Sequence, residues 1–239
     1  MPTEHVMGMP VRVAGEIDAA AVFAWLRWVD ATFSSYREDS EISRLGRGER
    51  FAPHPLVREV LERCEALRIE TGGLFDPRAG GRLDPSGYVK GWAVQRAAAF
   101  GHGRFLIDAG GDMVLRGRWR VGIRHPRERD RLAATITVSD CAVATSGAYE
   151  RGEHIVDPRT GRAAGGVDSV TIVGDDLGTV DAYATAAFVA GDPAWAARLT
   201  ALVIAGDRVF TTAAWPRGRS RQAQSASRRP SAGTPARRS

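Results

Sequence analysis

The sequence predicts an α+β fold in a single large body. Patterns typical of helices come first along the chain, a long stretch of strand patterns follows, and helical patterns return before the end. Such segregation favours an α+β architecture over a doubly wound sheet, in which helices and strands alternate. The 239 residues contain no internal repeat, and their 44% hydrophobic and 26% charged content is ordinary for a globular protein with a substantial core.

The N-terminal part of the chain predicts one strand and two helices. Residues 6–13 have the composition of an opening strand. Residues 18–36 repeat apolar side chains at three- and four-residue steps, as an amphipathic helix does: Val22, Leu26, Val29 and Phe33. A second helix is predicted over residues 55–70. The glycine pair Gly72-Gly73, which follows it, is a typical signal for the end of a helix.

The rest of the body is predicted to be loop, helix, strands and helix in turn. The segment 74–87 is too rich in Gly, Pro and Asp for regular structure, and the next helix is expected to run from Lys90 to about Phe100. Seven short runs separated by turn residues are expected to form strands: FLIDA, MVLRG, WRVGI, AATITVS, CAVATS, HIVDP and SVTIVG. Two more helices and a last strand are expected over residues 179–190, 194–202 and 203–212.

The basic character of the chain is confined to its C-terminal end. The net charge is +5, but the last 23 residues hold seven arginines and no acids, so the remainder carries +5 minus 7, a net −2. A basic nucleic-acid-binding face on the body is therefore excluded, and no specific nucleic acid is expected as a partner. The composition predicts a domain over residues 1–212 and a disordered tail rich in Arg, Ser and Pro over 213–239.

Nothing in the sequence indicates a membrane span or export. It has no run of about 18 apolar residues, its first residues lack the segments of a signal peptide, and no N-terminal cysteine could carry a lipid. Cys64 and Cys141 lie far apart and are expected to be reduced residues of the core. We therefore expect the protein in the cytoplasm or at the inner face of the membrane.

Lys90 is the only lysine among the 33 basic residues, and it closes a glycine-rich loop. Glycines let backbone amides approach a ligand, a helix N-terminus attracts anions, and lysine offers a compact point charge where arginine offers a planar fork. These features indicate a phosphate or pyrophosphate site, although a tight loop that only caps a helix would look the same. The Walker and GxGxxG patterns are absent, which excludes a P-loop and a dinucleotide-binding Rossmann site.

Asp181 and Thr185 lie four residues apart in a predicted helix, so their side chains share one face. A carboxylate and a hydroxyl are hard oxygen ligands of the kind that Mg²⁺ binds. The neighbouring residues are mostly alanine, which allows close packing against another backbone. From spacing alone, an Asp favoured by the helix dipole and a Thr bonded to its own helix explain the pair somewhat better than a metal site does.

His154 precedes the apolar pair Ile155-Val156 in a predicted strand that ends at the turn Asp157-Pro158. Histidine gains and loses protons close to working pH, so His154 is a candidate general base for a hydroxyl. A single histidine at the start of a strand is more often structural, and spacing does not decide between the two.

Eight segments, taken in order along the chain, carry a family resemblance that covers about residues 6–210. They are MGMPV (7–11), FSSYREDSEISRLGRG (33–48), TGGLFDP (71–77), DPSGYVKGWAVQRA (84–97), DAGGDMVLRG (108–117), AVATSGAYER (142–151), HIVDPRTGR (154–162) and SVTIVGDDLGTVDAYATAAFVAG (169–191). Together they resemble the ApbE family of FAD:protein FMN transferases, and DPRTG with TxDAxATAxF is highly specific. The resemblance implies a T-fold-related α+β body, with mixed or antiparallel β-sheets flanked by helices.

The resemblance also implies a reaction and its residues. Such enzymes cleave the pyrophosphate of FAD with Mg²⁺, release AMP, and attach FMN by a phosphoester bond to a Ser or Thr of an acceptor protein. Mg²⁺ would be bound by Asp181, Thr185 and the backbone carbonyl of Val89, and His154 and Lys90 match the catalytic positions. The residues implied to bind FAD are Met7, Tyr36, Leu74, Phe75, Asp76, Asp84, Lys90 and Ile155.

Two other functions remain open at this point. An FAD diphosphatase, which gives FMN and AMP to water, needs the same metal site but no groove for an acceptor protein. A flavin-binding or carrier protein would hold FAD without cleaving it, and it would need no metal.

Overall fold

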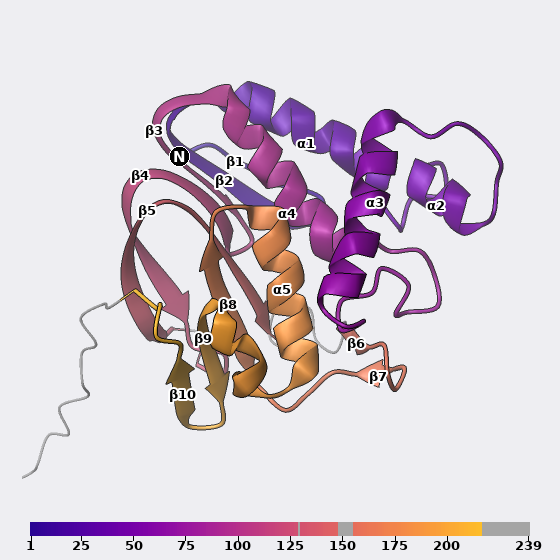
Figure 1. Ribbon diagram of the computed structural model, residues 1–239. Helices are drawn as coiled ribbons and strands as arrows, with labels where there is room; N and C mark the ends of the chain where they lie inside the picture. The colour runs from indigo at the N-terminus through magenta and orange to yellow at the C-terminus, as the bar shows by residue number, and fades with distance from the viewer. Residues whose placement is uncertain (129, 148–154, 217–239) are drawn as a thin grey trace, which may run out of the picture.

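An antiparallel sheet of eight strands forms the centre of the structure, a computed structural model that describes residues 1–128, 130–147 and 155–216 (Figure 1). The strands lie side by side in the order β1-β2-β3-β4-β5-β8-β9-β10. Their bounds are Thr3–Val6, Met9–Ile17, Gly101–Ala109, Asp112–Arg124, Leu132–Gly147, Ser169–Gly174, Thr200–Ala205 and Arg208–Thr211. A separate ribbon pairs β6 (Val156–Asp157) with β7 (Arg162–Ala163). The α+β prediction is confirmed.

Helices cover one face of this sheet (Figure 1). Three of them, α1 (Ala19–Phe33), α4 (Ser86–Ala97) and α5 (Leu177–Ala190), bury their apolar sides against it and form the main core. Two more, α2 (Glu41–Gly46) and α3 (Pro55–Glu70), lie at the side of the molecule. Strands alternate their side chains between faces, so a second, smaller apolar cluster forms on the other face: Leu115, Val121, Ile123, Ile136, Val138, Cys141 and Val143.

The first two strands correct the prediction of a single strand over residues 6–13. The backbone turns at Met7 and Gly8, both with positive φ (54° and 72°), and Val6 pairs with Met9. Two consecutive residues of positive φ make the tight turn that suits the twist of a hairpin. The apolar character of this stretch hid the turn, because methionine seldom adopts such a conformation.

Helix α4 begins at Ser86, so the prediction that a helix begins with Lys90 is wrong. Lys90 lies in the second turn of the helix, and its ammonium is not part of a helix N-terminus. The glycine-rich loop is accordingly shorter than expected, because Gly87 already belongs to α4. Tertiary packing outweighs the low helix propensity of this stretch.

The C-terminal part of the body also differs from expectation. Residues 194–202 were expected to be helical, but only a short 3-10 helix forms there (Pro193–Arg198), and β9 follows at once. The final strand predicted over 203–212 is a hairpin of β9 and β10. MVLRG and WRVGI merge into β4, and AATITVS and CAVATS merge into β5, with a register shift between Leu115 and Arg118. The predicted tail lies outside the described residues from 217 onward.

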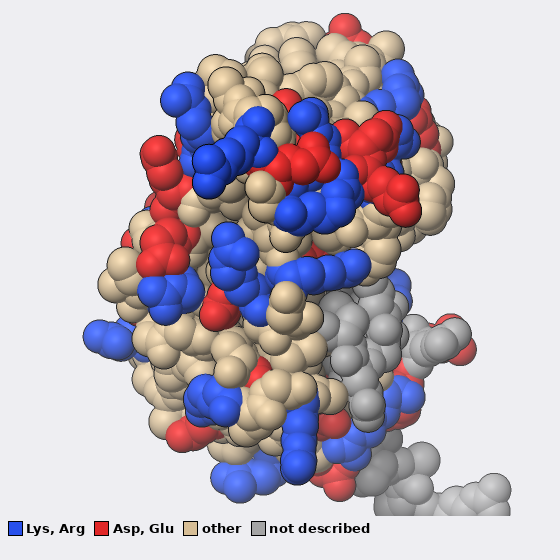
Figure 2. All heavy atoms as spheres, turned by 90° about the vertical axis from the view of Figure 1, so that its right-hand side faces the viewer, with Lys and Arg blue, Asp and Glu red and all other residues tan. Residues whose placement is uncertain are grey.

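The surface formed by α2 and α3 carries many paired charges. Figure 2 shows acidic and basic side chains intermingled on this face, and the ion pairs include Arg44–Glu49 and Arg68–Glu65. Both pairs are exposed, where ion pairs contribute little stability. No described helix combines the length and apolarity needed to span a bilayer.

Candidate active site

A cavity of about 1380 Å³ opens at the end of the sheet where the β1–β2 and β3–β4 turns lie. Its other sides are the loop before α4 and the crossing of α4 with α5. Pockets for drug-sized ligands are usually smaller, roughly 300–1,000 Å³, so this cavity suits a large ligand. Every predicted site residue that the structure describes lines it: Met7, Tyr36, Leu74, Phe75, Asp76, Asp84, Val89, Lys90, Ile155, Asp181 and Thr185. His154 lies outside the described residues.

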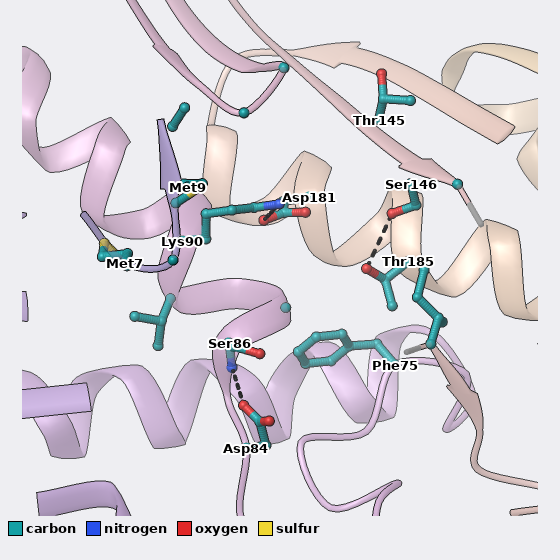
Figure 3. A pocket seen from close by; sticks show the side chains of 18 of the residues that line it. Met7, Met9, Phe75, Asp84, Ser86, Lys90, Thr145, Ser146, Asp181 and Thr185 are labelled. Atoms are coloured by element: carbon teal, nitrogen blue, oxygen red, sulfur yellow. Dashed lines mark hydrogen bonds and ion pairs between the residues drawn. The ribbon is translucent and has the colours of Figure 1, made fainter. Parts of the chain in front are cut away.

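Two helices that approach unusually closely form the floor of the cavity. A Cβ added to Gly91 of α4 would lie 2.5 Å from the carbonyl oxygen of Leu177, and one added to Gly178 of α5 would lie 3.1 Å from the nitrogen of Trp92. Gln95 of α4 also accepts a hydrogen bond from the Leu177 amide, at 2.9 Å, which ties the start of α5 to α4. The crossing therefore brings Lys90 to the same side as Asp181 and Thr185 (Figure 3), and Val89 lines the same cavity.

Lys90 lies between two buried carboxylates on this floor. Its Nζ forms a close ion pair with Asp112 Oδ2 and lies 3.7 Å from Asp181 Oδ2. Asp112 and Asp181 are only 1% and 2% exposed. Burying carboxylates is costly unless opposite charges or hydrogen bonds compensate. Among the described residues, two carboxylates thus lie beside one ammonium, an arrangement that favours a bound cation.

Hydroxyl groups stand next to this cluster. Thr185 Oγ1 lies 3.4 Å from Ser146 Oγ of β5 (Figure 3), and the two form a hydrogen bond. Gly87 brings the first turn of α4 close to the same hydroxyl, since a Cβ there would lie 3.9 Å from Thr185 Oγ1. Asp181 and Thr185 thus point to the same space from successive turns of α5, as their spacing predicts.

The donor atoms at this place fit Mg²⁺, which prefers oxygen ligands. Asp181 supplies a carboxylate, Thr185 and Ser146 supply hydroxyls, and Val89 belongs to the adjacent turn of α4. Within the described ranges, no group of three or more His, Cys, Asp or Glu could hold an ion by itself. A Mg²⁺ ion here would complete its coordination with water or phosphate oxygens, as this ion commonly does.

Two tight hairpin turns form the wall beside the floor. One is the Met7-Gly8 turn, and the other is Gly110-Gly111, with φ of 67° and 104°, between β3 and β4. The turns are adjacent because β2 pairs with β3, and the Gly110 amide donates to the Pro10 carbonyl at 3.1 Å. Asp108 stabilises the second turn by accepting from the Gly111 amide (2.9 Å) and pairing with Arg12 (2.8 Å).

The rim of the cavity is built from the loop before α4 and from the end of α1. Phe75 is buried and packs against Gly87, whereas Tyr36 is 78% exposed and has the Arg82 guanidinium 5.1 Å from its ring centre. Asp76 and Asp84 accept hydrogen bonds from the amides two residues ahead of them, at 2.8 and 3.1 Å. These bonds are Asx turns, which hold a loop in shape.

Ile155 also lines the cavity, directly before the ribbon of β6 and β7. Arg159 fastens this ribbon to α5 by donating to the carbonyl of Val189, at 3.0 Å. The same guanidinium forms hydrogen bonds with Asp157 and lowers the pKa of that carboxyl. The DPRTG segment is thus a turn in which the Asp157–Arg159 pair anchors strand β6 to α5.

The sequence interpretation missed two polar residues of the floor, Asp112 and Ser146. Both lie in segments that it singled out, DAGGDM and AVATSG, but neither was assigned a role. A signal for Asp112 was present: an acid directly after a glycine pair at a hairpin turn. The contact of Asp112 with Lys90 joins β4 to α4, and spacing along the chain does not reveal such a contact.

Comparison with known proteins gives the same family as the resemblance found in the sequence. The model of the ApbE family matches residues 7–82 and 77–205. The chain is 27% identical to the FAD:protein FMN transferase of Rhodobacter capsulatus, over 72% of this chain and 44% of that protein. It is 37% identical to the FAD:protein FMN transferase of Treponema pallidum, over 56% of this chain and 48% of that protein. The chain therefore spans about half the length of the curated relatives it matches.

Solved structures share the fold. The crystal structure of the ApbE protein from Thermotoga maritima superposes with a TM-score of 0.80 at 23% identity, over 89% of this chain and 96% of that chain. The flavin transferase ApbE from Vibrio cholerae gives a TM-score of 0.77 at 23% identity, with the same coverage. At such low identity the likeness establishes the fold alone, and it confirms the ApbE-like architecture predicted from the sequence.

Proposed function

The chain belongs to the ApbE family, and we propose that it is a Mg²⁺-dependent FAD:protein FMN transferase. The reaction would cleave the pyrophosphate of FAD, release AMP, and join FMN by a phosphoester bond to a Ser or Thr of an acceptor protein. The observation that carries the proposal is the buried cluster of Lys90, Asp112 and Asp181, with the Thr185 hydroxyl beside it, on the floor of a large cavity. The curated relatives named as FAD:protein FMN transferases support the substrate.

Phosphoryl transfer mainly requires positioning and charge stabilisation. In our proposal Asp181, Thr185 and the carbonyl of Val89 hold Mg²⁺, which when bound would neutralise charge on the diphosphate oxygens. Lys90 adds a positive charge beside Asp181, and its position in the second turn of α4 places its ammonium on the floor. Because the cluster is buried, its charges act in a medium that screens them weakly.

The groups farther from the floor suit the rest of FAD. Met7, Tyr36, Phe75 and Ile155 offer apolar or aromatic surface to the flavin and adenine rings, and aromatic rings stack well on such faces. Asp76 and Asp84 keep the loop between them in shape, so that these surfaces stay in place. We propose His154 as the base that takes the proton of the acceptor hydroxyl.

The experiment that tests this function is an incubation of the purified chain with FAD, MgCl₂ and a candidate acceptor protein. We expect AMP in the supernatant and an acceptor whose mass has increased by bound FMN, both abolished by EDTA. AMP without a labelled acceptor would identify an FAD diphosphatase instead, and unchanged FAD would identify a carrier. Mass spectrometry of the acceptor and chromatography of the nucleotides distinguish the three outcomes.

A further inference from the structure

Asp112 is held more firmly than the lysine it contacts. It starts β4 directly after the Gly110-Gly111 turn and pairs in register with Ala109. Its Oδ1 accepts a hydrogen bond from the Thr145 amide of β5, at 2.9 Å, so that its carboxylate is fixed from the sheet. It is also 1% exposed. A carboxylate held in this way determines where a flexible partner lies.

Lys90 is such a flexible partner. Four methylene groups separate its ammonium from the backbone, and it reaches from α4 across the floor to both carboxylates. The contact with Asp112 is the close one, and the contact with Asp181 is longer, at 3.7 Å. A compact ammonium can sit between two buried carboxylates, whereas the broad fork of arginine needs more space and a planar partner. The retention of a single lysine in an arginine-rich chain agrees with this geometry.

We propose that Asp112 is a positioning residue, which holds the Lys90 ammonium on the sheet side of the floor and thereby limits its hold on Asp181. The inference rests on the proposed function, in which Asp181 binds Mg²⁺. If Asp112 lost its charge, Lys90 would move toward the other carboxylate that it contacts on the described floor, that of Asp181 at 3.7 Å. A cation would then have to displace an ammonium before it could bind.

The test compares Mg²⁺ binding by three variants, measured by calorimetry with MgCl₂ and no FAD. Asp112→Asn keeps the shape and an oxygen for the Thr145 amide but removes the charge, and we expect the dissociation constant to rise about tenfold or more. Lys90→Met/Asp112→Asn also removes the competing ammonium, and its dissociation constant should return to within about threefold of the parental value. Asp108→Asn is the matched control, because Asp108 lies in the same turn but pairs with Arg12.

The same variants separate positioning from a general loss of structure. If Asp112 acts through Lys90, excess Mg²⁺ should restore most of the FMN transfer rate of Asp112→Asn, with the effect confined to the half-saturating Mg²⁺ concentration. The double variant should regain Mg²⁺ affinity yet transfer FMN slowly, since it lacks the lysine. A structural defect would lower the melting temperature and would not be relieved by removing a second charged group.

Three results would overturn the inference: unchanged Mg²⁺ affinity in Asp112→Asn, an equal loss in Asp108→Asn, or a double variant as weak as the single one. These outcomes differ from failure of the proposed function. A parental chain that binds Mg²⁺ and shows the expected pattern, but forms no flavinylated acceptor, would leave the positioning role standing and remove the transferase assignment. A parental chain that binds no Mg²⁺ would contradict both.

Discussion

The floor and the rim of the cavity are built in different ways. The floor consists of two regular helices in backbone contact and the start of β4, and its charged groups Asp112 and Asp181 are almost completely buried. The rim consists of loop and helix-end residues, with Tyr36 mostly exposed. In our proposal, the groups that stabilise charge are therefore held in place before a ligand binds, whereas the groups that would contact the rings of the ligand can adjust.

Substitutions should therefore act differently in the two regions. A change on the floor disturbs either a buried charge or a backbone contact, and neither can relax into solvent. A change at an exposed rim residue such as Tyr36 removes little contact with the rest of the protein, so it should alter the affinity for the ligand more than the rate. The predictions below test this difference, beginning with the largest effect.

The largest effect is expected from Asp181→Asn on the floor. The variant keeps the shape of the side chain but loses the carboxylate that we propose for Mg²⁺, so FMN transfer should fall by roughly 10³-fold or more, about 4 kcal/mol. The rate of acceptor labelling at saturating FAD measures it. Asp176→Asn is the control, because it removes a charge from the cap of the same helix and keeps an oxygen for the Thr179 amide. Parental activity in Asp181→Asn would refute the metal assignment.

The part of the floor that could be predicted from the sequence is the part that depends on spacing within one element. Asp181 and Thr185 share a face because they are four residues apart on α5, and no other information is needed. The Lys90–Asp112 contact could not be predicted in this way, because it joins two elements that are brought together by the crossing of α4 over the sheet. Long-range packing decides such contacts.

In the fold, too, features set by the local sequence could be predicted, whereas features set by long-range packing could not. The segregation of helices and strands was enough for the α+β class, and the helix over residues 55–70 was predicted with the observed bounds. The turn at Met7 and the start of α4 at Ser86 were missed, because local composition favoured a strand and a loop there. In both places the packing of neighbouring elements selects the conformation: the β1–β2 pairing at Met7, and the contact of Gly87 with Phe75 in α4.

A second prediction concerns the backbone contact in the floor. Gly91→Ala would place a Cβ 2.5 Å from the Leu177 carbonyl oxygen, so α4 and α5 would have to separate. We expect a loss of about 1–3 kcal/mol in the free energy of unfolding and weaker Mg²⁺ binding. Gly80→Ala in the rim is the control, since nothing lies within 4 Å of the added atom. Urea denaturation measures the free energy of unfolding of the two variants, and equal stability of Gly91→Ala and Gly80→Ala would contradict a tightly packed floor.

A third prediction concerns the rim. Tyr36→Ala removes an exposed ring whose protein contact is Arg82, so the fold should not suffer. We expect KM for FAD to rise about three- to tenfold, with kcat within about twofold, because stacking contributes about 1 kcal/mol. Tyr36→Phe keeps the ring and should retain the parental KM. Steady-state kinetics with varied FAD decides, and a fall in kcat alone would mean that Tyr36 acts on the chemical step.

The smallest effect is expected on stability at alkaline pH, from the phenol of Tyr88 in α4, to which we assign no role in the reaction. Burial, together with the nearby Asp176 carboxylate, raises the pKa of Tyr88 to about 12, and burial raises that of Cys64 to about 12. These groups ionise at lower pH in the unfolded chain than in the folded chain, so their stabilising contribution is complete below about pH 9 and is lost as the pH rises toward 12.

Tyr88→Phe should therefore lose less stability than the parental chain between pH 9 and 11, as measured by urea midpoints. Tyr36→Phe leaves the buried phenol in place and should follow the parental curve; if Tyr88→Phe followed it too, the phenol of α4 would have to be accessible to water in the folded protein.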